Sequence, residues 1–351
     1  MSRFLLVLTA VMLTVSCGRN NIVSGVPVRY VTAERSMELK ADSSFRYDFP
    51  QSLQCVDLTI ANDSILVLRE TVGSSDSLKF FGCYSLRDYS WLGDYVVKGR
   101  GPGEALNPFI RGMLRAADGR ECCYVGDAML GRVYELDLPL SIERGGTVIR
   151  ELHGVPANTV YNYPYRDSLR FLVRIGDEDR MLYEVVTADN EVRRSFNLYR
   201  SVSAENCLSQ ISHCTVVNQR AGLAALLMLG LPQMNIIDLE SGEVRSFAVD
   251  REYRRWRDII ERYDGDSGLY YNYATATEDV ILATYAGKSV MEFANDRNVH
   301  IHVFDWSGSF LYDITVRENV NAMAFDELGG MLYALDRNAN RIYRYDMSEL
   351  I

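Results

Sequence analysis

Two histidines near the C-terminal end of the chain, His300 and His302, are placed so that both could hold one metal ion. They stand two residues apart in a segment that alternates like a β-strand, so both imidazoles are expected on the same face of a sheet. Two imidazoles supply two ligands, whereas a structural zinc site normally takes four. No third ligand is evident, so His300 and His302 are weak metal candidates and no bound metal is expected.

A glycine-rich segment over residues 98–104 is a second candidate site, because glycine-rich turns can surround a phosphate. The segment lacks the Lys-Ser/Thr ending of a P-loop, and Pro102 removes one backbone amide that would contact an anion. The interpretation that we favour is a tight turn between structural units. In the alternative, Lys98 and Arg100 bind a carboxylate or a phosphate, and both are carried as candidate ligand contacts.

The N-terminal segment predicts export and lipidation. An apolar run over residues 4–13 follows Arg3, is too short to span a bilayer, and leads to small residues around Cys17. This arrangement resembles a bacterial lipoprotein signal, in which the chain is cut before the cysteine and the cysteine is acylated; the alternative is an ordinary secretory signal. We expect a signal peptide over residues 1–16 and a lipid anchor at Cys17 that holds the protein to the cell envelope. No acidic run follows Cys17, so the expected location is the periplasmic side of the outer membrane.

The composition narrows the classes of partner. A formal net charge of −10 argues against nucleic acid, which needs a basic surface for its phosphates. After residue 16 no apolar stretch approaches the ~20 residues that a membrane helix requires. The 22 tyrosines against 13 phenylalanines favour many half-buried strands. No Cys-x-x-Cys motif is present, and most of the cysteines after Cys17 are expected to be small buried hydrophobes.

The body of the chain is built from a repeated unit. From about residue 44, several short strands and turns recur at spacings of about 40–50 residues, which is typical of propeller blades. One strand of each unit carries a marker residue near an acid: Tyr84, Tyr134, Tyr183, Ile237, Phe304 and Tyr345. The strand before each marker is interpreted as apolar throughout, at residues 64–68, 122–125, 169–173, 222–227, 280–285 and 331–335. These are taken as inner strands, covered on both faces by neighbouring blades.

Six copies predict an all-β fold, a six-bladed propeller over residues 44–351 that forms one domain. Residues 17–43 are expected to be a lipidated tether that leads into it, and the C-terminal strands to complete a blade begun near residue 45. One short inserted helix is predicted at residues 250–263, where an aromatic stripe that includes Trp256 recurs at helical spacing. The favoured interpretation packs this helix over the end of the propeller. In the alternative it is a lid or a partner-binding element, with Trp256 as a candidate ligand contact.

Three segments resemble one known family. Gly99 to Glu104 is similar to a Gly-x-Gly-Pro-Gly-Glu turn between two blades, residues 303–308 to a strand and turn of Phe-Asp-aromatic-x-Gly type, and residues 324–346 to the final strands. On these segments the chain resembles the TolB-like six-bladed propeller lipoproteins of Gram-negative bacteria. The resemblance implies the propeller fold. At the level of fold it suggests partner binding, since TolB itself is a periplasmic protein-binding propeller.

No catalytic signature is evident, and the Gly-x-Ser-x-Gly motif of serine hydrolases is absent. We therefore expect a non-enzymatic binding module without a cofactor, held to the membrane by its lipid, whose partner is an envelope protein or a glycan. The alternative is a metal-dependent hydrolase or lyase with its site in the propeller channel. Calcium would be its cofactor, with oxygen ligands recruited from four residues, Asp127, Asn218, Asn272 and Asp305. Whether the protein has catalytic activity is left open.

Overall fold

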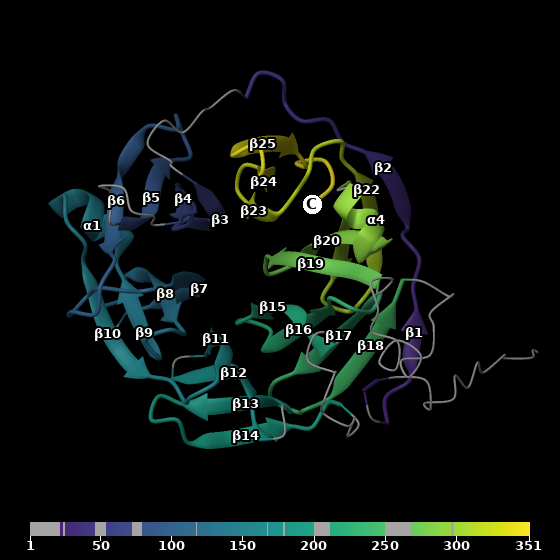
Figure 1. Cartoon of the computed structure of the whole chain (residues 1–351), viewed down its shortest axis with the longest axis horizontal. Helices are drawn as coiled ribbons and strands as arrows, with labels where there is room; N and C mark the ends of the chain where they lie inside the picture. The colour runs from purple at the N-terminus through teal and green to yellow at the C-terminus, as the bar shows by residue number, and fades with distance from the viewer. Residues whose placement is uncertain are drawn as a thin grey trace, which may run out of the picture.

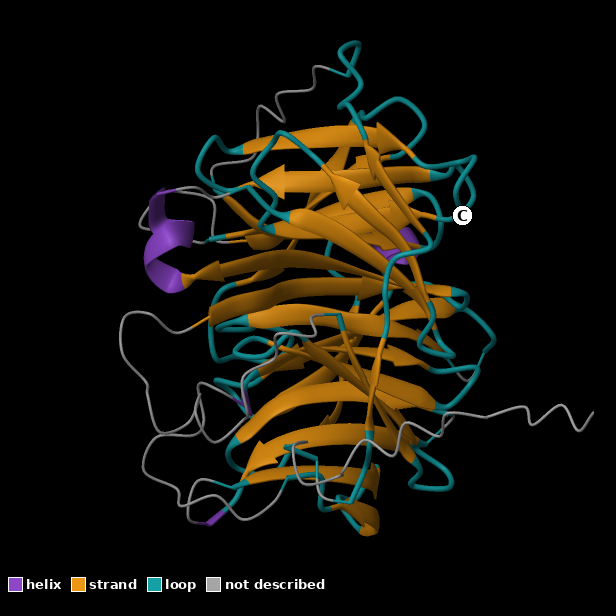
Figure 2. Ribbon diagram, turned by 90° about the vertical axis from the view of Figure 1, so that its right-hand side faces the viewer, coloured by secondary structure: helices purple, strands orange, loops and turns teal. Residues whose placement is uncertain are grey.

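The computed structural model of the chain describes residues 22–45, 54–71, 79–199, 211–249 and 268–351, apart from positions 24, 117, 167, 178, 179, 296 and 297. Six sheets stand around a central axis like the blades of a propeller (Figure 1). In the side view the strands stack in successive layers, and the turns gather at the two faces of the ring (Figure 2). The predicted all-β, six-bladed fold is confirmed.

The strands of each blade follow chain order from the channel outward, and neighbours are antiparallel. Blades 1 to 3 contain β3 (Cys55–Ala61), β4 (Ile65–Glu70), β5 (Lys79–Ser85) and β6 (Trp91–Val97); β7 (Pro108–Arg115), β8 (Glu121–Asp127), β9 (Arg132–Leu136) and β10 (Ile149–Gly154); and β11 (Thr159–Tyr165), β12 (Leu169–Ile175), β13 (Met181–Thr187) and β14 (Val192–Phe196). Blades 4 to 6 contain β15 (His213–Asn218), β16 (Leu223–Met228), β17 (Gln233–Asp238) and β18 (Val244–Ala248); β19 (Gly268–Ala276), β20 (Val280–Ser289), β21 (His300–Asp305) and β22 (Phe310–Thr315); and β23 (Ala322–Asp326), β24 (Met331–Asp336) and β25 (Arg341–Asp346).

The apolar strands that precede the markers are the second strand of each blade, not the innermost. Leu66 and Leu68 of β4, for example, are fully buried, because neighbouring blades cover both faces of the strand. The innermost strands lie one position nearer the axis and are more polar. β7, which carries Arg111 and Arg115, is only partly buried along most of its length. The apolar strands therefore lie one strand farther from the axis than predicted. Burial on two faces, not nearness to the axis, determines how apolar a strand is.

Two short helices occur in the described residues. α1 (Leu138–Arg144) joins β9 to β10, and α4 (Val290–Asn295) joins β20 to β21. The Asp137 side chain caps α1 by accepting a backbone N–H at 2.9 Å, and Gly145 ends the helix with a φ of 65°. Helices of seven and six residues are too short to show a helical period in the sequence. The helix predicted at residues 250–263 lies outside the described part of the chain.

Among these residues, no helix combines the length and the apolar character needed to cross a membrane. In the described residues blade 6 holds β23, β24 and β25, and blade 1 begins with β3. Residues 46–53 lie outside the described part of the chain, so closure by a blade begun near residue 45 stays a prediction. The last blade also meets the first through side chains. Cys55 N–H donates to Oδ1 of Asn340 at 3.2 Å, and the hydroxyls of Tyr89 and Tyr333 are 3.0 Å apart.

Residues 22–45, which we call the strap, run along the outer edges of blades 4, 5 and 6, seen in purple at the rim of the ring in Figure 1. β1 (Val28–Tyr30) pairs in parallel with β18, and β2 (Arg35–Glu38) pairs in parallel with β22. Beside β25, the backbone N–H of Asp42 donates to the carbonyl of Arg344 at 2.8 Å. The strap therefore covers outer edges that would otherwise expose unpaired backbone groups.

The strap is fastened at its start by buried apolar residues. Ile22 and Val23 are each 1% exposed, and Val23 forms a β-bridge with Tyr199. Both pack at the junction of blades 3 and 4 against three buried residues, Ile211, Met228 and Leu231. From Ile22 onward, the segment predicted as a tether over residues 17–43 is thus docked on the propeller. Its strands of three and four residues are too short to show alternation in the sequence.

Candidate functional site

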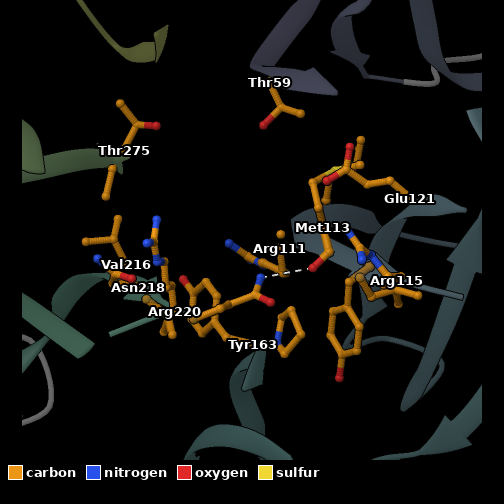
Figure 3. Close-up of a pocket in the computed structure, with 18 of the residues that line it drawn as sticks. Thr59, Arg111, Met113, Arg115, Glu121, Tyr163, Val216, Asn218, Arg220 and Thr275 are labelled. Atoms are coloured by element: carbon orange, nitrogen blue, oxygen red, sulfur yellow. Dashed lines mark hydrogen bonds between the residues drawn. The ribbon is translucent and has the colours of Figure 1, made fainter. Parts of the chain in front are cut away.

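The centre of the ring holds a cavity of about 1090 Å³. The innermost strand of every blade contributes to its wall, and Figure 3 shows Thr59, Arg111, Tyr163, Asn218 and Thr275 around it. In each blade lining residues lie toward the C-terminal end of the innermost strand or in the turn that follows it, and blades 2 and 3 add residues from their outer strands. The cavity therefore opens at the face of the ring where the first and second strands of each blade join. We call this opening the turn mouth.

Blade 2 contributes both arginines and carboxylates to the cavity wall, and the carboxylates are those of Glu121 and Glu135. Arg111 and Arg115 both lie on β7, and neither forms an ion pair with a carboxylate of the described residues. The guanidinium carbon of Arg111 lies 4.6 Å from the centroid of the Phe109 ring and 5.4 Å from that of the Tyr161 ring. These aromatic faces attract the cation and hold its side chain in place without neutralising its charge.

Further carboxylates line the turn mouth from other blades. Asp63, Glu278 and Glu327 line it from blades 1, 5 and 6. Burial, followed by the nearby carboxylates of Asp63, Glu278 and Asp279, raises the pKa of Glu327. Arg220 of blade 4 offsets part of this charge through an ion pair with Glu278 at 2.5 Å. A ligand that enters the turn mouth therefore meets a group of acidic side chains from blades 1, 5 and 6 and, from blade 2, arginines beside carboxylates.

Between blades 2 and 3 the cavity extends outward along a groove. Tyr124 and His153 line this groove from blade 2, and Arg170 lines it from blade 3. The Tyr124 hydroxyl donates to Oδ1 of Asn162 at 2.9 Å and lies 3.4 Å from Nε2 of His153. Burial, with the charge of Arg170, lowers the pKa of His153 to about 4, so this imidazole is neutral at pH 7. The groove thus combines a phenol, a neutral imidazole and a guanidinium.

Sequence reasoning missed Arg170. It lies within residues 169–173, a strand interpreted as apolar throughout, yet its side chain belongs to the cavity wall and the residue is 2% exposed. A charged residue inside an otherwise apolar strand is the signal that could have found it. Charged side chains are almost never fully buried unless something pairs with them.

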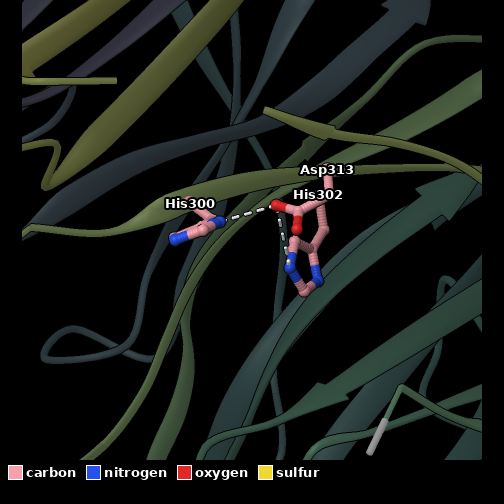
Figure 4. A group of neighbouring side chains, drawn as sticks. All are labelled: His300, His302 and Asp313. Carbon is pink, nitrogen blue, oxygen red and sulfur yellow. Dashed lines mark hydrogen bonds and ion pairs between the residues drawn. The ribbon is translucent and has the colours of Figure 1, made fainter. Parts of the chain in front are cut away.

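His300 and His302 lie on one face of β21, as predicted, and the structure adds a third group (Figure 4). Asp313 comes from β22, directly opposite His302 in the sheet, and its Oδ1 lies 2.6 Å from Nδ1 of His300 and 3.7 Å from Nε2 of His302. The hydrogen bond with Asp313 raises the pKa of His300, whereas burial lowers that of His302 to about 3. His300 and Asp313 thus form a hydrogen-bonded pair beside a neutral imidazole, and the three groups supply one ligand fewer than a structural zinc site.

The glycine-rich turn lies between β6 and β7 and fills its own anion site. Oε2 of Glu104 accepts the backbone N–H of Gly101 at 2.7 Å, and a Cβ at Gly99 would collide with the same carboxylate. Lys98 and Arg100 are exposed, and neither lines the cavity. The tight-turn interpretation fits this geometry, because the amide that would hold an anion already holds Glu104. The role of Lys98 and Arg100 as ligand contacts stays a prediction.

The four residues considered for calcium do not form a ring. Asn218 lines the cavity, but Asp127, Asn272 and Asp305 do not. The buried carboxylate of Asp127 accepts four backbone N–H groups at 2.6–3.1 Å, two from the segment before β7 and two from the turn after β8. Asp305 accepts backbone N–H groups in the turn between β21 and β22. Both carboxylates are therefore committed to shaping turns.

Five cysteines fall in the described residues, and all are free thiols: Cys55, Cys83, Cys122, Cys123 and Cys214. Four of them are buried in the apolar layers between strands, which agrees with their interpretation as small hydrophobes. Burial raises the pKa of the Cys214 thiol to about 12. Cys17 and Trp256, which were singled out from the sequence, and the remaining cysteine, Cys207, lie outside the described part of the chain.

The chain matches no model of a known protein family and no curated protein. Among solved structures it is similar to a member of the DUF4221 family from Bacteroides vulgatus, with 11% identity and a TM-score of 0.57, over 90% of this chain and 97% of that chain. It is similar to a predicted exported protein from Bacteroides fragilis, with 11% identity and a TM-score of 0.52, over 89% and 99% of the two chains. Raptor from Chaetomium thermophilum gives 11% identity and a TM-score of 0.49 over 88% of this chain, which spans 29% of that one. At such identities the likenesses bear on the fold alone.

Proposed function

We propose that this propeller is an exported binding module, anchored to the cell envelope through Cys17, that takes a glycan or a protein segment into the turn mouth. The observation that carries the proposal is the cavity of about 1090 Å³, which every innermost strand lines and which opens at one face. Concave sites of this order, with a few convergent polar groups, are the usual places for ligands. The expected location rests on the N-terminal segment around Cys17.

The character of the wall supports binding. Carboxylates and an imidazole from four blades line the cavity, among them Asp57, Glu121, His153, Glu278 and Glu327. Among the described residues none of them belongs to a group of three whose ligand atoms lie within 4.8 Å of one another. Acid–base or metal chemistry needs such groups within about 3 Å of one reacting atom. Arginines and carboxylates around one opening instead orient a ligand that carries charge or many hydroxyl groups.

Filling the cavity tests this proposal. Thr59→Trp and Thr275→Trp place a large ring in the wall from blades 1 and 5, and Val192→Trp on the outer strand β14, where the residue is 50% exposed, is the matched control. Each protein is screened on a glycan array and against envelope extracts. We expect ligands of the wild type to bind the control equally and the filled variants at least about tenfold more weakly, through lost contacts and steric exclusion. Equal capture by the filled variants, or no ligand for the wild type, would overturn the proposal.

A further inference from the structure

Arg170 is a buried cation without a counter-charge. The residue is 2% exposed, and it forms no ion pair with any carboxylate of the described residues. Its Nη2 donates to the carbonyl of Thr187 and to Oδ1 of Asn190, both at 2.8 Å. Its Nε and Nη1 atoms are buried and have no partner. Burying an unpaired charge is costly, so such a group calls for an explanation.

The next arginine on the same strand shows what the fold does when a guanidinium is structural. Arg174 is partly buried on β12, and its Nη2 lies 2.7 Å from the carboxylate of Glu184 on β13. Arg170 is more deeply buried and lacks such a partner. The carboxylate of Asp189 lies near the groove but is not a counter-charge for Arg170, since Asp189 is exposed and forms no ion pair among the described residues. The contrast points to a group that this chain does not itself provide.

A second set of unfilled donors lies beside Arg170. Asn162 is 6% exposed, and its Oδ1 accepts the Tyr124 hydroxyl while its Nδ2 has no partner. Asn162 pairs with Leu172 across the sheet, which places it diagonal to Arg170 on the same face of blade 3. Tyr124 lies next to both, since its hydroxyl donates to Oδ1 of Asn162 and the charge of Arg170 acts on it. All of the unfilled groups here are N–H donors, and N–H donors take an oxygen acceptor.

We propose that Arg170 and Asn162, beside Tyr124, bind an oxyanion, namely a carboxylate, sulfate or phosphate group, that enters from the groove between blades 2 and 3. Guanidinium and amide N–H groups hold such oxygens with charge-assisted hydrogen bonds. Arg170 and Tyr124 both line the cavity, so the anion has a path to them from the turn mouth. The inference rests on the proposed function in one respect: it gives the ligand of the cavity an acidic group. The anion comes either as a free ion or on an acidic sugar.

Binding of simple oxyanions tests the inference. The probes are inorganic phosphate, inorganic sulfate, acetate and glucuronate, each at millimolar concentration, with glucose as the neutral match for glucuronate and chloride at equal ionic strength. Calorimetry and thermal unfolding are read on the wild type and on Arg170→Met. We expect at least one oxyanion to bind the wild type and to bind Arg170→Met at least about tenfold more weakly, because a charge-assisted hydrogen bond is lost. Tighter binding of glucuronate than of acetate identifies an acidic sugar, and equal binding identifies the free ion.

Two further variants keep the test decisive. Arg245→Met is the matched control, since Arg245 also donates to backbone carbonyls, of Trp306 and Ser307 at 3.1 Å, and lies outside the cavity. It is expected to bind oxyanions like the wild type. Asn162→Leu removes a donor without removing a charge and is expected to weaken oxyanion binding. It provides the test if Arg170→Met fails to fold. No oxyanion effect beyond that of chloride, or an equal effect in Arg170→Met, would show that Arg170 is only structural.

The two proposals can fail separately. If Arg170→Met captures glycans or envelope proteins as well as the wild type does, the oxyanion inference is wrong and the binding module stands. If oxyanions bind through Arg170 but Thr59→Trp and Thr275→Trp capture ligands unchanged, the cavity is not the binding site of the module and the oxyanion inference stands.

Discussion

The four histidines of the chain respond to acid in opposite ways. Burial lowers the pKa of His213 and of His302 to about 3 and that of His153 to about 4, whereas the hydrogen bond with Asp313 raises the pKa of His300. Where the folded-state pKa is lowered, the unfolded state binds more protons below about pH 6.5, so stability is lost as the pH falls. A raised pKa contributes stability below about pH 6.5, and this contribution is lost as the pH rises through the folded-state value.

We therefore expect the free energy of unfolding to fall between pH 7 and pH 5, since three histidines have lowered pKa values and only one has a raised pKa. Each deeply buried histidine contributes about 2 kcal/mol to the fall between pH 6.5 and pH 5. Urea denaturation across this range measures it, and His213→Gln is expected to reduce the fall by about that amount, because the titrating group is gone. His300→Gln is expected to steepen it. A stability that does not change with pH, or a slope that His213→Gln leaves unaltered, would contradict this account.

For single residues, the sequence predicts well which side chains share one face of a strand and poorly which side chains of different strands are in contact. That His300 and His302 share a face follows from the two-residue period of a strand. Their contact with Asp313 depends on the register between β21 and β22, which a bulge shifts by one residue. Arg170 was passed over because its four neighbours in residues 169–173 are apolar. Its missing counter-charge can be seen only when the surrounding blades are in place.

Among the elements, the strap is the one whose contribution can be measured alone. Ile22 and Val23 fasten it at the junction of blades 3 and 4, and each is 1% exposed. We expect the double variant Ile22→Ser and Val23→Ser to lower the free energy of unfolding by about 2–4 kcal/mol, because it replaces buried apolar groups with hydroxyls. Tyr30→Ser on β1, where the residue is 45% exposed, is the control and should change stability little.

Limited proteolysis completes the strap test. In the double variant the strap should be cut before the blades, while circular dichroism still reports the β-sheets. The opposite order, or an unfolding midpoint equal to that of the wild type, would mean that the buried start of the strap does not fasten it.

The blades could be predicted from the sequence and the strap could not. Marker residues such as Tyr84 and Tyr134 recur because each blade buries the same position between its neighbours, and both are fully buried. The strap has no such repeat. β1 and β2 pair with strands far away in the sequence, and their exposed side chains leave no apolar pattern. Long-range parallel pairing of three or four residues has no local signature.

For the whole molecule, the proposed lipid anchor makes a simple prediction. Cys17→Ser removes the thiol that would be acylated, so the protein should move from the membrane fraction to the soluble fraction of cells that express it. Incorporation of a labelled fatty acid should be lost in the same variant. Ligand capture by the purified propeller should not change, because the cavity is built from residues 57 to 328. A Cys17→Ser protein that stays in the membrane fraction would contradict lipid anchoring at this residue.

The docking of Ile22 and Val23 also decides which way such a molecule would face. Ile211 directly precedes β15, and Met228 pairs with His213, the first residue of that strand, so the strap starts at the face of the ring opposite the turn mouth. From Cys17 to Ile22 a fully extended chain spans at most about 17 Å. An acylated Cys17 would therefore hold the face at the start of the strap against the lipid and direct the turn mouth toward the water. Its ligands would arrive from the aqueous compartment, not from the bilayer.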